Sequence, residues 1–170
     1  MWQRRSFHEC ADELAQISEI FRSEWRSHYR FDMTLAASNP ILKDTSKKGV
    51  EILRILALAI RSEQDFGLLP KAGSIVGAMN EDAAPGEITR ALSTYAPPYV
   101  EFEKSVPLDI RGALNKIAHA NPSRSGLFAD SQHHEVVLCG ANGKKNWVAV
   151  LSIIDLCKAI KLLPEQQFVE

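Results

Sequence analysis

The sequence has few cysteines, almost no net charge and no long apolar run, and each shortage excludes a class of protein. Three cysteines occur in 170 residues, at positions 10, 139 and 157, and no two form a C-x-x-C pair. An odd and dispersed set fits buried thiols in a reducing compartment better than a disulfide framework or a zinc site. The formal net charge of -1 gives no overall attraction to nucleic acid or to an anionic membrane.

Signals for export, membrane insertion and cofactor binding are missing as well. The N-terminal residues carry positive charge, but no apolar run follows them as in a signal peptide. The most apolar stretch, residues 50–60, contains Glu51 and Arg54 and is far shorter than the ~20 residues that span a bilayer. The sequence has no glycine-rich phosphate loop, no G-x-S-x-G and no H-E-x-x-H motif. We therefore expect a cytoplasmic protein with no membrane contact, no cofactor and no metal.

Several stretches of the sequence show the periodicity of amphipathic helices. Apolar residues recur at three- and four-residue steps, and they predict helices over residues 6–28, 44–64, 85–95, 107–121 and 153–163. Asn39-Pro40 reads as a break before the second of these helices, and Pro107 reads as the start of the fourth. Residues 65–106 are rich in glycine and proline, and apart from the short helix we expect them to be irregular.

The C-terminal part has a different pattern. β-Branched, extended segments lie on both sides of Asn142-Gly143, which is a typical two-residue hairpin turn. They predict a β-hairpin over residues 134–151, followed by a helix that Ser152 caps. We expect one domain over residues 1–170 of mainly α class: an antiparallel helical bundle with a small C-terminal β-hairpin and a final helix.

The helix predicted for residues 107–121 carries the most suggestive chemistry. Arg111, Asn115 and His119 are spaced four and four, so they form a row beside the apolar stripe. His119 can act as a general acid or base near neutral pH, and Arg111 can stabilise charge on a phosphate, held or oriented with the help of Asn115. Arg111 and His119 are roughly 12 Å apart along the axis, at about 1.5 Å per residue. A compact site would therefore need a second copy, in a homodimer.

A simpler interpretation of the same row is a solvated helix flank. Arginine and asparagine are usually exposed on such flanks, and His119 lies in the last turn, where a cation suits the helix dipole.

A small helical bundle with an Arg and a His late in one helix resembles the HEPN superfamily of prokaryotic toxin and defence proteins. The resemblance implies a metal-independent ribonuclease site, formed across a dimer by Arg111 and His119. This chain departs from the family pattern, because seven residues rather than four to six separate the pair and Gly112 follows the arginine. The departure implies either an inactive site or a non-catalytic relative.

Two further features of the sequence are candidate functional groups. Lys144 and Lys145 lie at the hairpin tip beside Trp147, and a basic tip with an aromatic ring can grip RNA. The alternative is a polar turn with Trp147 packed beneath it. We expect His133-His134 to be a surface pair and the cysteines to be core residues.

The sequence leaves two functional hypotheses. The first is a HEPN-like toxin or defence protein, of toxin–antitoxin type, that binds and cleaves RNA or is a degenerate relative of such enzymes. The second is a non-enzymatic protein-interaction or regulatory module, which uses the apolar first helix and the irregular middle to bind a partner protein.

Overall fold

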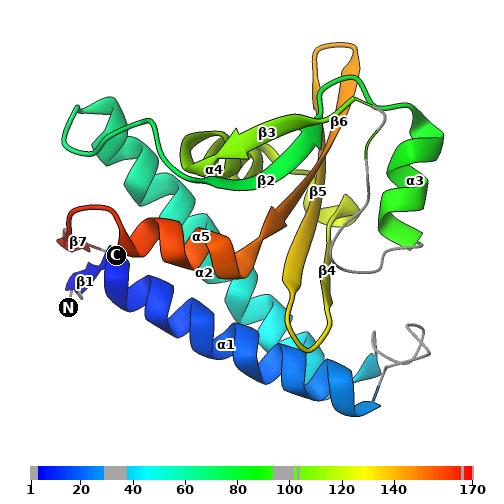
Figure 1. Ribbon diagram of the computed structural model, residues 1–170, viewed down its shortest axis with the longest axis horizontal. Coiled ribbons are helices and arrows are strands. Elements are labelled where there is room, and N and C mark those ends of the chain that lie inside the picture. Colours follow the sequence, from blue (N-terminus) through cyan, green and yellow to red (C-terminus); the bar gives the residue numbers. More distant parts are fainter. Residues whose placement is uncertain (1–3, 29–37, 94–101, 103, 166, 170) are drawn as a thin grey trace.

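The computed structural model describes residues 4–28, 38–93, 102, 104–165 and 167–169 (Figure 1). Its helices are α1 (Phe7–His28), α2 (Pro40–Asp65), α3 (Pro85–Ser93), α4 (Ile110–His119) and α5 (Ile153–Lys161), with a short 3-10 helix, η2 (Pro122–Arg124). Its strands are β1 (Arg4–Ser6), β2 (Ile75–Asn80), β3 (Val106–Asp109), β4 (Gly126–Ala129), β5 (His134–Asn142), β6 (Lys145–Ser152) and β7 (Gln167–Val169).

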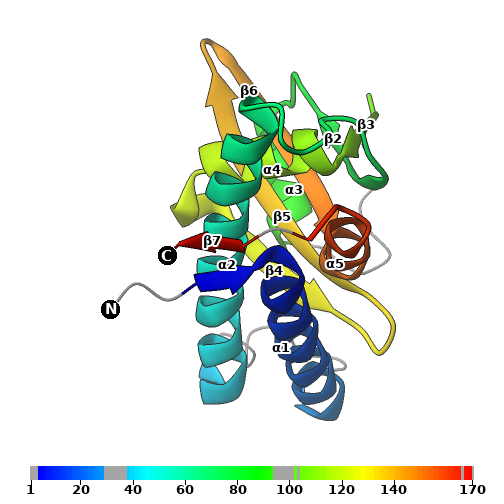
Figure 2. The same cartoon turned by 90° about the vertical axis from the view of Figure 1, so that its left-hand side faces the viewer.

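Five of the strands form one antiparallel sheet in the order β3-β2-β6-β5-β4. Helices α1, α2, α4 and α5 lie on one side of this sheet, and α3 lies on the other (Figure 1). Viewed from the side in Figure 2, α1 and α2 run next to each other, and β1 and β7 form a separate two-stranded pair beside them. The molecule is an α+β fold in three layers.

The predicted mainly α bundle is therefore wrong. The two strands of the expected hairpin are present around Gly143, whose φ of +61° fits a tight turn. However, they are inner strands of a five-stranded sheet, and β2 and β4 flank them. Residues 75–80, expected to be irregular, form β2, and Pro107, expected to start a helix, lies in β3. Residues 94–101 of the predicted irregular region lie outside the described residues.

Helix starts follow local capping chemistry. Ser6 and Glu9 form a reciprocal capping box at the start of α1, in which each backbone N–H donates to the other side chain at 2.9 and 3.0 Å. The side chain of Asn39 accepts hydrogen bonds from two backbone N–H groups, so Asn39-Pro40 begins α2 instead of breaking the chain. Asp109 caps α4 by accepting from the Gly112 N–H at 2.8 Å.

The sheet separates two apolar cores. The larger core joins α1, α2, α4 and α5 to one face, with Leu14, Leu56 and Leu151 among its fully buried side chains. The smaller core lies under α3, where Ile88 packs against Val148 and other residues of the opposite face. Alternation along β5 and β6 sends successive side chains to the two cores in turn. These two strands therefore serve both cores, which explains why they are buried along most of their length.

Candidate functional site

Arg111, the predicted phosphate-binding residue, is held by the end of α2. Its guanidinium donates to the Arg61 carbonyl and to Gln64 Oε1, both at 3.2 Å, and lies 2.9 Å from an oxygen of Asp65. Desolvation raises the pKa of Asp65, but the hydrogen bond from Lys71 and the charge of Arg111 outweigh it and leave the pKa below its usual value. In this chain Arg111 joins α4 to the C-terminal turn of α2.

Asn115 and His119, the other two members of the predicted row, do not join Arg111 in a shared site. The Oδ1 of Asn115 is buried and has no hydrogen-bond partner in the described part of the chain. His119 is exposed at the end of α4. Within one copy of the chain, the three side chains do not converge.

The predicted RNA-contacting group at the hairpin is divided between surface and core. Trp147 is only 2% exposed, and the ammonium of Lys116 covers its ring at 4.5 Å from the centroid. Burial lowers the pKa of Lys116, an effect that Glu81 partly offsets. Lys144 is exposed in the turn, and Lys145 lies 3.8 Å from Asp82. Only the two lysines are thus open to a ligand.

The histidine pair is not a surface pair. His134 is buried, shares a 2.8 Å hydrogen bond with Ser18 and stacks on Phe21. Burial, together with the charge of Arg22, lowers the pKa of His134 to about 3. His133 lies nearer the surface, with its Nδ1 2.9 Å from Asp130.

The expectation that the cysteines are core residues is confirmed, since all three are buried. In the ranges that the structure describes, no three His, Cys, Asp or Glu side chains gather as a metal site.

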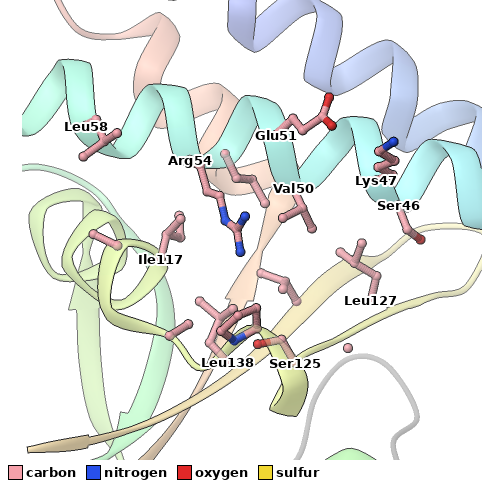
Figure 3. Close-up of a pocket in the computed structure, with 16 residues that line it drawn as sticks. Ser46, Lys47, Val50, Glu51, Arg54, Leu58, Ile117, Ser125, Leu127 and Leu138 are labelled. Carbon is pink, nitrogen blue, oxygen red and sulfur yellow. The ribbon is translucent and has the colours of Figure 1, made fainter.

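A groove that the sequence patterns did not reveal lies beside helix α2. It encloses about 830 Å³ between α2, the end of α4, η2 and strands β4 and β5. Its walls are mainly apolar, with Val50, Leu58, Ile117, Leu127 and Leu138 among them (Figure 3). Leu58 is 67% exposed on the groove side of α2.

Local structure fixes the wall of the groove opposite α2. The backbone N–H of Asn121 donates to the Cys139 carbonyl at 2.7 Å, which ties the end of α4 to β5. The side chain of Asn121 accepts from both the backbone and the hydroxyl of Ser123, and its carbonyl accepts from the Ser125 hydroxyl. The turn around η2 is therefore held by its own hydrogen bonds, and Ser125 and Gly126 lie along the groove.

Arg54 is a charged side chain that extends from α2 into this groove. Figure 3 shows it reaching from α2 toward Ser125 and Leu138, and Lys47 and Glu51 of the same helix also line the groove. Arg54 is exposed, and no ion pair or hydrogen bond of its side chain occurs within the described residues. The sequence contained a signal for this site, since Arg54 interrupts an apolar run, but that signal does not reveal which elements face it.

Comparisons with family models, with curated proteins and with solved structures found no match. No helix in the described ranges is long and apolar enough to cross a membrane.

Proposed function

We propose that this chain is a non-enzymatic binding module, which takes a small and largely apolar ligand into the groove between α2, α4 and the β4–β5 edge of the sheet. The observation that carries the proposal is the groove itself, with about 830 Å³ of space and mainly apolar walls. Small-molecule sites usually have volumes of roughly 300–1,000 Å³, apolar walls and a few polar groups that orient the ligand.

The composition of the groove favours binding over catalysis. Its ionisable lining residues are Lys47, Glu51 and Arg54, and the lining includes no histidine, cysteine or aspartate among the described residues. A serine hydroxyl needs an adjacent base to act as a nucleophile, and the Ser125 hydroxyl instead donates to the Asn121 carbonyl. The groove thus supplies apolar walls and a small net positive charge, from two cations and one anion, which suit recognition.

A neutral fluorescent probe tests this proposal. We expect N-phenyl-1-naphthylamine to bind the purified chain with a saturable rise in fluorescence. Ala118→Trp places an indole in the groove from an exposed position and should abolish the signal. Ser62→Trp adds the same indole to an exposed position of α2 outside the lining, and should bind the probe normally. Equal binding by the two variants, or no saturable binding by the unmodified chain, contradicts the proposal.

The ribonuclease hypothesis stays a prediction, and it can be checked separately. His119 is exposed, so His119→Ala should fold normally and report on chemistry alone. The binding-module proposal expects no RNA cleavage by the unmodified chain in the presence of EDTA. Cleavage that survives EDTA and disappears in His119→Ala would instead support the enzyme.

A further inference from the structure

We infer that the ligand of this groove is a long-chain monocarboxylate, with its carboxylate on Arg54 and its hydrocarbon chain along the apolar walls. The inference rests on the proposed function, because it names the ligand class of the same site. It is carried by one juxtaposition, a guanidinium without a partner among the described residues inside an apolar groove.

The two lysines that line the smaller groove are already paired with carboxylates. The smaller groove between α1 and α5 contains Lys161 and Lys158, and both have acidic neighbours. Lys161 lies 2.9 Å from Asp12, and Lys158 lies 3.9 Å from Asp155. Arg54 has no such neighbour within the described residues, although Glu51 is only one turn away on α2. An anion from outside the chain therefore meets complementary charge in the larger groove.

The head group is best matched by a carboxylate. A guanidinium presents a planar fork of donors that binds a carboxylate through two parallel hydrogen bonds. A doubly charged phosphate monoester calls for a larger excess of positive charge, whereas the ionisable lining residues Lys47, Glu51 and Arg54 carry a net charge of +1. This balance favours a head group with a single negative charge.

The body of the ligand is best matched by a hydrocarbon chain. An extended peptide in the groove would bring backbone N–H and C=O groups that need partners, and the apolar part of the lining is mainly leucine, isoleucine and valine. A hydrocarbon chain has no such groups, and it gains from every methylene removed from water. Leu58, which is 67% exposed, would become covered on binding.

The same arrangement should discriminate against uncharged analogues. An alcohol of equal length would displace water from Arg54 without offering a charged acceptor, and a desolvated donor left poorly paired weakens binding. We expect dodecanoate to bind at least about tenfold more tightly than dodecanol, in line with the strength of charge-assisted hydrogen bonds. From octanoate to dodecanoate, each added methylene should tighten binding by up to about fourfold.

The test is displacement of N-phenyl-1-naphthylamine from the full chain, with every competitor below its micelle-forming concentration. The competitors are octanoate, decanoate, dodecanoate, dodecanol, dodecylammonium and dodecyl phosphate, together with an acidic amphipathic helical peptide. Arg54→Gln should weaken dodecanoate by at least about tenfold and leave dodecanol unchanged. Lys43→Gln removes an exposed cation from the same helix outside the lining, and should change the affinity for dodecanoate by less than about twofold.

The outcomes separate the two proposals. If the probe binds and Ala118→Trp blocks it, but dodecanoate and dodecanol compete equally, the groove binds ligands and the carboxylate inference is wrong. Tighter competition by dodecylammonium, by dodecyl phosphate or by the peptide than by dodecanoate also overturns the inference, as does an Arg54→Gln variant with unchanged dodecanoate affinity. Failure of the probe to bind the groove rejects the proposed function itself.

Discussion

His134 and Glu135 are neighbours in β5, and each has one buried side-chain atom without a hydrogen-bond partner in the described part of the protein. Their side chains point to opposite faces of the sheet. Burial therefore shifts the pKa of a base, His134, at one face and the pKa of an acid, Glu135, at the other. Burial lowers the pKa of His134 to about 3, whereas burial and the charge of Asp155 raise the pKa of Glu135 to about 7. Both residues are thus uncharged in mildly acidic solution.

Glu135 should make the fold less stable as the pH rises. The folded chain holds its proton up to about pH 7, whereas an unfolded chain releases it near the ordinary pKa of 4.5. Its contribution is therefore fully present below that lower value and is lost as the pH rises through the window between the two. Glu135→Gln should remove this loss, so that the variant gains stability over the unmodified chain between about pH 5 and pH 8.

Urea unfolding at both ends of this window measures the effect. His134 contributes the opposite slope, with stability lost as the pH falls below its ordinary value of 6.5. Because His134 is present in both proteins, the difference between them isolates Glu135. A pH profile of Glu135→Gln identical to that of the unmodified chain would contradict the assignment.

Arg111 should matter for stability. Arg111→Ala removes the hydrogen bonds to the Arg61 carbonyl and to the buried Gln64, and should lower the free energy of unfolding by about 1–2 kcal/mol. The ion pair with Asp65 adds little, because surface pairs contribute little to stability.

Arg54→Ala is the matched control for Arg111. Its side chain makes no ion pair or hydrogen bond to any described residue, so the free energy of unfolding should change by less than about 0.5 kcal/mol. Denaturant titration of the two variants provides the measurement. Equal stabilities would show that Arg111 does not hold the end of α2.

At the scale of elements, the helices were predictable and most of the sheet was not. Helices α1, α3 and α5 lie within about two residues of their predicted bounds where the chain is described, because an amphipathic stripe is a local signal. β3 has only four residues and includes Pro107, and proline is tolerated in strands mainly at sheet edges, where β3 lies. Its pairing with β2 depends on contacts that no local pattern contains.

β2 was missed because Gly77 lies in its middle, and glycine usually weakens a strand. The structure supplies the reason for the glycine. A Cβ at this position would lie 2.2 Å from the Val150 carbonyl oxygen and 2.9 Å from a methyl group of Leu151. The absence of a side chain allows β2 to approach β6 closely, next to a register shift between residues 75 and 77.

Gly77→Ala should therefore destabilise the protein by about 3 kcal/mol or more, since overpacking against backbone cannot be relieved by a rotamer change. Gly86→Ala is the matched control, because nothing lies within 4 Å of its added Cβ. Gly86 is in α3, where alanine favours the helix by up to about 1 kcal/mol. Thermal unfolding should thus move in opposite directions for the two variants, and similar shifts would contradict this account of β2.

At the scale of the molecule, the two apolar cores share the sheet that separates them. Each core contains at least one cysteine, so thiol reactivity can measure the opening of each core. Cys10 and Cys157 lie in the larger core, and Cys139 lies in the smaller core. Burial raises the pKa of the Cys139 thiol to about 11, and burial with the charge of Asp12 raises that of Cys157 to about 12. Neither thiol is ionised at neutral pH while the protein is folded.

The thiols should become reactive toward a disulfide reagent only on global unfolding. In chains with a single cysteine at position 139 or 157, the denaturant concentration that exposes the thiol should be the same, because β5 and β6 contribute to both cores. Reaction of the Cys139 thiol at a distinctly lower denaturant concentration would show that the core under α3 opens independently.

The candidate site also belongs to the scale of the molecule, which explains why sequence patterns did not identify it. Arg111 and His119 of the predicted row both lie on helix α4, but they do not form one site. Arg111 contacts α2, and His119 is exposed to solvent. The groove needs side chains from α2, α4, β4 and β5, which are up to 92 positions apart between Ser46 and Leu138. Only the three-dimensional fold brings Arg54 opposite Ser125.

The pairing of β1 with β7 has a topological consequence. Arg4 and Val169 are register partners in this antiparallel pair, so their Cα atoms lie only about 5 Å apart. A short peptide can therefore join the two ends of the described chain, and a circular permutant can be opened instead at the exposed Asn142-Gly143 turn. The same closeness allows the whole unit to be inserted into a surface loop of another protein without separating that loop's ends.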